Sequence, residues 1–118
     1  MIDRRADMIS KETVEIVKKF RDDRNWSQFH NPKDLAISLS LEAAELLEIY
    51  QWSADDLDCL DKLDKVKEEL ADVFCYGILL ADRYGLDLDE IIQAKMKKNA
   101  EKYPVEKAAG VSTKYTDL

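Results

Sequence analysis

Residues 41–50 read Leu-Glu-Ala-Ala-Glu-Leu-Leu-Glu-Ile-Tyr, and residues 68–76 read Glu-Glu-Leu-Ala-Asp-Val-Phe-Cys-Tyr. In each stretch two acidic residues stand three positions apart among apolar neighbours. The first pair is Glu42 and Glu45, and the second is Glu69 and Asp72. Side chains at positions i and i+3 lie on one face of an α-helix. The sequence therefore predicts two helices, each with a pair of carboxylates on one face.

Four carboxylates brought together need a compensating cation. Two like charges 4 Å apart repel by about 1 kcal/mol in water and about 4 kcal/mol at an effective dielectric constant of 20. Twenty-three residues separate Glu45 from Glu69, enough for a loop that folds the second helix back against the first. Carboxylate oxygens suit Mg²⁺ or Mn²⁺. The pattern favours a divalent metal held by all four side chains; the alternative is that both pairs line solvated helix faces.

The composition bounds the class of protein. With 118 residues, 46% of them apolar, the chain is long enough for one domain, residues 1–118. The net charge of −7 disfavours a nucleic-acid polymer or an anionic membrane as partner, so a polyphosphate substrate would have to arrive with metal. No apolar run suggests a signal peptide or a membrane span. Cys59 and Cys75 lack metal-ligand spacing and indicate reduced thiols in a cytoplasmic protein.

Helical periodicity covers most of the chain, and no strand pattern is present. Asn31-Pro32 is a typical helix start, and Asp87 with Glu90 three residues later forms a capping box. We expect an all-α, four-helix antiparallel bundle, with helices at 10–24, 32–52, 62–84 and 87–103, a frayed segment 1–9 and an extended tail 105–118. The apolar stripes expected to form its core contain Val14, Val17, Phe20, Leu35, Leu39, Leu46, Ile49, Leu63, Val66, Leu70, Val73, Phe74 and Leu80.

Several other residues are candidates for ligand binding, each with a plainer alternative. Trp26 and Trp52 lie just outside the two ends of the second helix, where they either cover the core or stack on a base. His30 precedes an Asn-Pro turn, where it is either a catalytic residue or a hydrogen-bonded loop residue. Tyr76 follows Asp72 by one helical turn, where it either presents its hydroxyl to whatever the metal holds or is a buried core residue. Lys95, Asn99 and Lys102, beside Tyr103, form a basic face that either meets an anion or is solvated.

Longer motifs resemble those of a known family. Besides the four acidic residues, they are Arg24-Asn-Trp-Ser-Gln-Phe-His-x-Pro32, Tyr50-Gln-Trp52, Lys95-Met-x-x-Asn99-x-x-Lys102-Tyr103-Pro104 and Lys114-Tyr-Thr-Asp-Leu118. Over residues 20–118 the chain resembles the MazG-like, all-α nucleotide pyrophosphohydrolases, and among them the small dCTP pyrophosphatases.

The resemblance implies Mg²⁺-dependent hydrolysis of a (deoxy)nucleoside triphosphate to the monophosphate and pyrophosphate, as house-cleaning of the nucleotide pool. It also implies a homodimer or homotetramer with sites near subunit interfaces. Glu42, Glu45, Glu69 and Asp72 would hold the metal, while Tyr76 and Asn99 would touch the nucleotide. Lys95, Lys102 and Tyr103 would face the phosphates. The nucleoside pocket would contain Trp26, Ser27, Gln28, Phe29, His30 and Trp52.

Three points stay open at this stage. Val17 stands where the eukaryotic family member has a base-contacting histidine, so the base preference is undetermined. Either Glu45 or Glu42 could take the proton of the attacking water. The alternative function is a regulatory helical module that binds nucleotides without turnover. A di-iron bundle is disfavoured, because such sites use Glu-x-x-His pairs and His30, the single histidine, is expected in a loop.

Overall fold

The computed structural model describes residues 9–118, which divide into two compact units. The division falls between Gly85 and Leu86. The first unit contains helices α1 (Lys11–Asp23), α2 (Pro32–Tyr50) and α3 (Leu63–Tyr84), with 3-10 turns η1 (Ser27–Phe29) and η2 (Leu60–Lys62). The second contains α4 (Leu88–Lys102), α5 (Val105–Ala108) and the 3-10 turn η3 (Tyr115–Asp117). No strand occurs in residues 9–118, so the predicted all-α class is confirmed.

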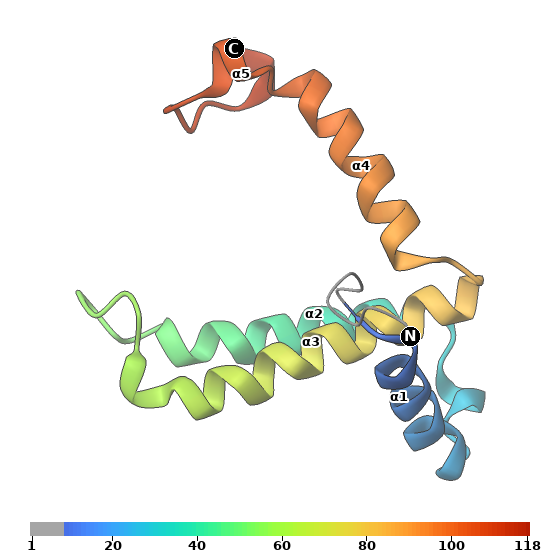
Figure 1. Ribbon diagram of the computed structural model, residues 1–118. Helices are drawn as coiled ribbons and strands as arrows, with labels where there is room; N and C mark the ends of the chain where they lie inside the picture. Colours follow the sequence, from blue (N-terminus) through green and yellow to red (C-terminus); the bar gives the residue numbers. More distant parts are fainter. Residues whose placement is uncertain (1–8) are drawn as a thin grey trace. The chain divides into compact units, whose positions relative to one another are not determined.

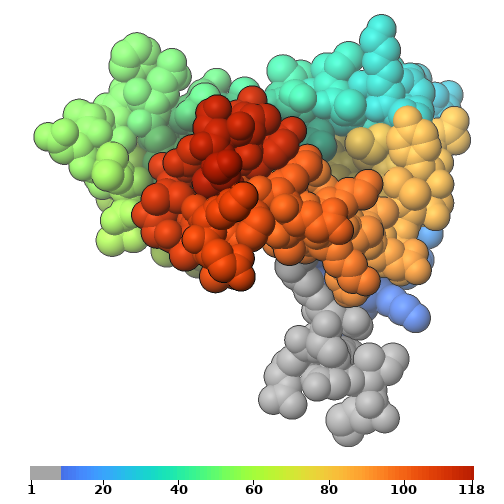
Figure 2. Space-filling model, turned by 90° about the horizontal axis from the view of Figure 1, so that it is seen from above, coloured from blue at the N-terminus to red at the C-terminus, as the bar shows by residue number. Residues whose placement is uncertain are grey.

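The first unit is built on the antiparallel pair α2 and α3. Figure 1 shows these two helices side by side, joined by residues 51–62. They make the most extensive contacts between elements, and α1 packs against α3. In the space-filling view the connection (green) and the start of α2 (cyan) lie at opposite ends of the unit (Figure 2). The predicted pairing of the two acidic helices is confirmed.

Local capping explains where the helices begin. The Thr13 N–H donates to Ser10 Oγ over 3.1 Å, and the Asp34 N–H donates to Asn31 Oδ1 over 2.9 Å, with Pro32 at the first helical position. In the second unit the Glu90 N–H donates to Asp87 Oδ1 over 3.2 Å. Each bond satisfies one N–H that the first turn leaves free. The starts predicted at Asn31-Pro32 and Asp87 are confirmed.

The core is smaller than the apolar stripes predict. Leu35, Ile49, Ile78 and Leu79 are buried, and so is Cys59 on the connection, whose Sγ lies 3.7 Å from the Ile49 carbonyl oxygen. Four residues expected in the core are exposed instead: three lie on α3, whose apolar surface α1 and α2 cover only in part, and one lies on α1. They are Phe20, Leu63, Leu70 and Phe74.

An ion pair fastens α1 to α3. The Arg21 guanidinium donates from Nη1 to Asp82 Oδ2 over 2.8 Å, and Lys18 Nζ lies 3.4 Å from Asp82 Oδ1. The hydrogen bond from Arg21 holds the pKa of Asp82 below its ordinary value. The Arg21 side chain is mostly buried, and the charge-assisted hydrogen bond joins α1 to α3.

The chain ends differ from the expectation. The tail 105–118, predicted to be extended, contains α5 and η3. After Pro104 the N–H groups of Lys107 and Ala108 donate to its carbonyl oxygen, which closes a short helical turn too brief to leave a periodic pattern. The segment 1–9, predicted to fray, lies outside the described residues except for Ile9. The single domain 1–118 stays a prediction.

Candidate metal and nucleotide site

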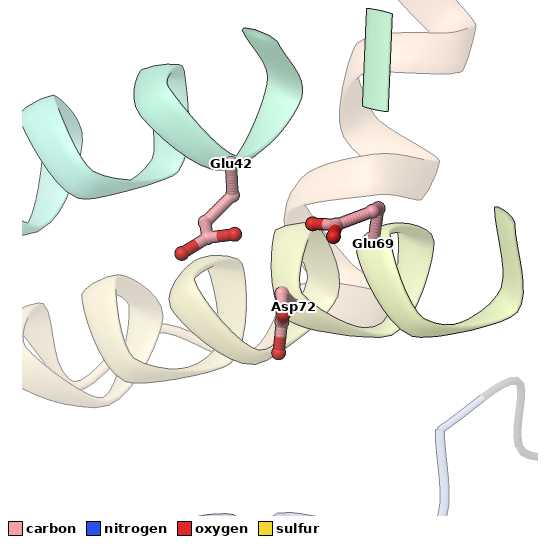
Figure 3. A group of neighbouring side chains, drawn as sticks. All are labelled: Glu42, Glu69 and Asp72. Carbon is pink, nitrogen blue, oxygen red and sulfur yellow. The ribbon is translucent and has the colours of Figure 1, made fainter. Parts of the chain in front are cut away.

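Three of the four predicted metal ligands come together between α2 and α3. Glu42, Glu69 and Asp72 each offer a carboxylate oxygen, and these three atoms lie within 4.8 Å of one another. In Figure 3 the Glu42 side chain extends from α2 toward α3, which bears the other two. Because α2 and α3 are antiparallel and packed, the spacings predicted from sequence place acids from two helices in one group.

Two oxygens of this group are buried and unused. Glu42 Oε2 and Glu69 Oε2 are inaccessible to solvent and have no hydrogen-bond partner among the described residues. Glu69 is only 8% exposed. An uncompensated carboxylate in such surroundings costs folding free energy. Hard oxygen donors left free in a cluster match the demands of a divalent ion such as Mg²⁺. The residues therefore fit a metal.

Glu45 lies beside this group rather than within it. It is exposed, and its carboxyl group contacts those of Glu42 and Glu69. The contact with Glu42 raises the pKa of Glu45, while the contact with Glu69 acts in the opposite direction. The structure thus separates the predicted foursome into three clustered carboxylates and one neighbour that remains open to water.

An apolar cavity of about 310 Å³ borders the cluster. Asp72 belongs to both, so the two features share a wall. Trp26, His30 and Tyr76, all predicted nucleotide contacts, line this cavity. The remaining lining residues come from α1 and α3, and they are Ile16, Val17, Phe20, Arg21, Cys75 and Leu79. Phe20 meets Trp26 edge to face, with ring centroids 5.6 Å apart.

Two polar groups of the cavity, the His30 imidazole and the Tyr76 hydroxyl, are held in their neutral forms. Burial, with a contribution from Arg21, lowers the pKa of His30, and its Nδ1 is buried without a partner among the described residues. Burial also raises the pKa of Tyr76, and Glu42 and Asp72 add to the effect; the Tyr76 hydroxyl contacts Ser38. An imidazole and a phenol in these states can exchange hydrogen bonds with an uncharged ring without adding charge.

Other predicted nucleotide contacts of the first unit lie outside this cavity. Ser27, Gln28 and Phe29 form η1 and are exposed, and Gln28 Nε2 donates to the Asn25 carbonyl oxygen over 2.9 Å. Trp52 is 87% exposed at the far end of α2. Since α2 has 19 residues, at 1.5 Å per residue its two ends are about 28 Å apart. Trp26 and Trp52 therefore cannot line one pocket within a single chain.

The basic face of the second unit is organised around a tyrosine. Lys102 Nζ lies 4.8 Å from the centroid of the Tyr115 ring, and the Tyr103 ring meets the same ring edge-on with centroids 5.9 Å apart. Asn99 is half-buried, and its Nδ2 lies 3.7 Å from Met96 Sδ; Lys95 is exposed. This unit is described by itself, and the phosphate-facing role of these residues stays a prediction.

Sequence reasoning missed two groups of residues. Phe20 was expected in the core, and Arg21 was not among the candidates. Both line the apolar cavity. A second cavity, of about 720 Å³, lies at the other side of the cluster. Its lining includes Lys62 and Lys65, and the remaining members are Glu45, Glu48, Ile49, Asp61, Asp64 and Glu69. Lys65 stands one helical turn before Glu69, and this spacing could have indicated from the sequence that Lys65 lies beside the carboxylates.

Comparison with known proteins identifies the family. The model of the MazG-like family matches residues 37–118. The chain belongs to the MazG-like family. It is 35% identical to dCTP pyrophosphatase 1 of Bos taurus over 92% of this chain and 70% of that protein. The mouse (Mus musculus) protein of the same name is 37% identical over 85% of this chain, which spans 62% of that relative's length.

A solved structure supports the same assignment. A pyrophosphatase from Archaeoglobus fulgidus has a TM-score of 0.74 and 43% identity, covering 80% of this chain and 91% of that one. These likenesses confirm the predicted family, the all-α fold and the class of enzyme, a nucleotide pyrophosphohydrolase. Among residues 9–118, no helix has the length and apolar character needed to cross a membrane.

Proposed function

We propose that this MazG-like protein hydrolyses (deoxy)nucleoside triphosphates to the monophosphate and pyrophosphate with Mg²⁺, for which Mn²⁺ can substitute. The observation that carries the proposal is the carboxylate group of Glu42, Glu69 and Asp72, which has two buried oxygens free and adjoins an apolar cavity. The relatives named for dCTP hydrolysis supply the substrate class. Removing surplus or non-standard nucleotides in the cytoplasm is the corresponding role, and the two free cysteines suit that compartment.

Different side chains of the site would hold the metal and accept the proton of the attacking water. A divalent ion, when bound, neutralises phosphate oxygens and activates water. Glu42, Glu69 and Asp72 would hold that ion, with Glu45 completing the set of carboxylates. Because Glu45 is exposed and lies beside the cluster, we assign it the acceptance of the water's proton in preference to Glu42.

The apolar cavity would receive the nucleoside. A base stacked on Trp26 gains about 1–3 kcal/mol, and His30 and Tyr76 supply neutral hydrogen-bonding groups. The cavity holds no ionised group except Arg21 and Asp72, and Arg21 is committed to Asp82. An uncharged ring fits such a cavity, with its sugar and phosphates directed toward Asp72.

Oligomerisation would complete the site. Trp52, too far away within one chain, would reach the nucleoside cavity of a second copy in a homodimer or homotetramer. Exposed apolar side chains on the first unit supply a surface for such contacts, since clusters of them mark interaction sites. They include Ile37, Leu41, Leu47, Leu57, Leu60 and Phe74.

A nucleotide panel tests the activity. We expect pyrophosphate from dNTPs in the presence of Mg²⁺, none in EDTA, and loss of the reaction in Asp72→Asn. The matched control is Glu68→Gln, an exposed glutamate on α3 that is not part of the carboxylate group. Orthophosphate as the first product would contradict the proposal, as would tight nucleotide binding without any product, which would indicate a regulatory binding module.

A further inference from the structure

One face of α3 carries an ordered series of side chains. Lys65, Glu69, Asp72 and Tyr76 recur at intervals of four, three and four residues, and Lys62 precedes the helix in the same register. Such intervals keep side chains on one face. Cations therefore come first along this face, the carboxylates follow, and the wall of the apolar cavity comes last.

Lys65 is the cation nearest to the buried carboxylate. Its Nζ lies 3.5 Å from Glu69 Oε1, while the other oxygen of Glu69 is buried without a partner among the described residues. The Lys65 side chain is 61% exposed, so its ammonium can leave Glu69 by rotation about its flexible stem. In the absence of metal Lys65 thus supplies part of the positive charge that the cluster requires.

A bound divalent ion would make this contact unfavourable. The ion and the ammonium would both lie against the Glu69 carboxylate, and two positive charges a few ångströms apart repel. Lys65 and Lys62 both line the cavity of about 720 Å³ on the side of Glu69 away from Asp72. That cavity also contains Glu45, Glu48, Asp61 and Asp64, so a phosphate chain could enter it only with its metal, and the two lysines are the donors available to it.

We propose that Lys65 exchanges Glu69 for the terminal phosphates of the nucleotide and holds the departing pyrophosphate, with Lys62 beside it. The assignment rests on the proposed function. It also fixes a direction: the nucleoside lies in the apolar cavity bounded by Tyr76, and the phosphates run along α3 toward Lys65. From Asp72 to Lys65 the axial distance is about 10 Å at 1.5 Å per residue, a length suited to a chain of three phosphates.

The test compares Lys65→Gln with Lys67→Gln. Lys67 is similarly exposed on the same helix, but it pairs weakly with Asp64, at 4.0 Å, and is not part of either cavity. Calorimetry with Mg²⁺ alone should show Lys65→Gln binding the ion about three- to tenfold more tightly, because a competing cation is gone. Calorimetry with pyrophosphate at saturating Mg²⁺ should show it binding roughly tenfold more weakly. Lys67→Gln should match the wild type in both titrations.

The two shifts of opposite sign distinguish an exchange from a structural role. Lys65→Arg, which keeps the charge, should restore pyrophosphate binding to within about threefold of the wild type. Unchanged titrations in Lys65→Gln, or two affinities that move in the same direction, would overturn the inference while wild-type pyrophosphate release stood. Absence of that release, or of Mg²⁺ binding by the wild type, would instead refute the proposed function.

Discussion

At the scale of the residue, Glu69 is a charged side chain in a buried position, which costs folding free energy. It is an almost buried carboxylate that pairs with the exposed ammonium of Lys65 over 3.5 Å, and its oxygen lies within 4.8 Å of carboxylate oxygens from two more acids. No requirement of helix formation or packing calls for an acid there, since an apolar residue would pack at lower cost. We infer that the role of Glu69 is to bind a metal ion rather than to stabilise the fold.

Glu69→Gln should therefore make the metal-free protein more stable and the enzyme inactive. Removing one buried charge relieves about 1 kcal/mol of repulsion, which corresponds to a rise of a few degrees in Tm for a chain of this size. Pyrophosphate release should fall by at least about 100-fold, because a metal ligand is lost. Thermal melts in EDTA and with Mg²⁺ measure the first effect; Mg²⁺ should raise the Tm of the wild type and of Glu68→Gln, and leave that of Glu69→Gln unchanged. Glu68→Gln should neither raise the Tm in EDTA nor lose activity, and a lower Tm for Glu69→Gln in EDTA would contradict this account.

Trp26→Ala should impair nucleotide binding and leave metal binding intact. Loss of one stacking platform costs about 1–3 kcal/mol, or a five- to 150-fold decrease in kcat/KM carried mainly by KM. Phe29→Ala is the matched control, because Phe29 belongs to the same loop, is 62% exposed and does not line the cavity. Steady-state kinetics with a pyrophosphate assay measures both. Equal losses in the two variants would place the nucleoside elsewhere.

At the scale of the element, the attachment of α1 to α3 shapes the apolar cavity, because Phe20 and Arg21 come from α1 and Asp72 and Tyr76 from α3. The Arg21–Asp82 ion pair is the polar part of that attachment. Asp82 is about one third exposed, so solvent weakens the pair without cancelling it.

Asp82→Asn should lower the free energy of unfolding at pH 7 by about 1 kcal/mol. The folded-state pKa of Asp82 lies below its ordinary 3.8, chiefly through the hydrogen bond from Arg21. The stabilisation is therefore complete above about pH 4 and disappears as the pH falls below it. Urea unfolding at pH 7 and at pH 3 should show the difference between variant and wild type at the first pH and a smaller one at the second. Asp23→Asn, in the exposed pair with Lys19, should have almost no effect at either pH.

Sequence reasoning reached the helices and the carboxylates for the same physical reason. Capping by Asn31 and Asp87 is local, and so is the i, i+3 spacing of Glu69 and Asp72, so neither needs knowledge of the fold. Cavities are different, because their walls join residues far apart in the chain. Val17 and Leu79, for example, meet only after α1 has packed on α3.

At the scale of the whole molecule, the first unit by itself leaves much apolar surface uncovered. Trp52 and Leu57 are among its most exposed side chains, and both belong to the end of the unit where α2 connects to α3. The sequence could not separate the exposed members of an apolar stripe from the core, because such a stripe has the same period whether it meets its own chain or another. Leu70 and Phe74 were placed in the core for this reason.

Mixed oligomers should regain activity if Trp52 completes the site of a second copy. Glu69→Gln supplies an intact Trp52, and Trp52→Ala supplies an intact carboxylate group. A heterodimer of the two would then have one whole site, and random mixing would restore roughly a quarter of wild-type activity. Refolding the two variants together and assaying pyrophosphate release measures the recovery. Activity no greater than the average of the separate variants would mean that each chain builds its site alone.

Asp72 belongs at once to the carboxylate group and to the wall of the apolar cavity. Under the proposed function, binding of the base and binding of the metal would therefore both depend on this one side chain. Under that function, a base that sits poorly against that wall would disturb the coordination of the ion directly. Nucleotides that fit the cavity differently would then require different Mg²⁺ concentrations for half-maximal activity, without a conformational change to link the base to the metal.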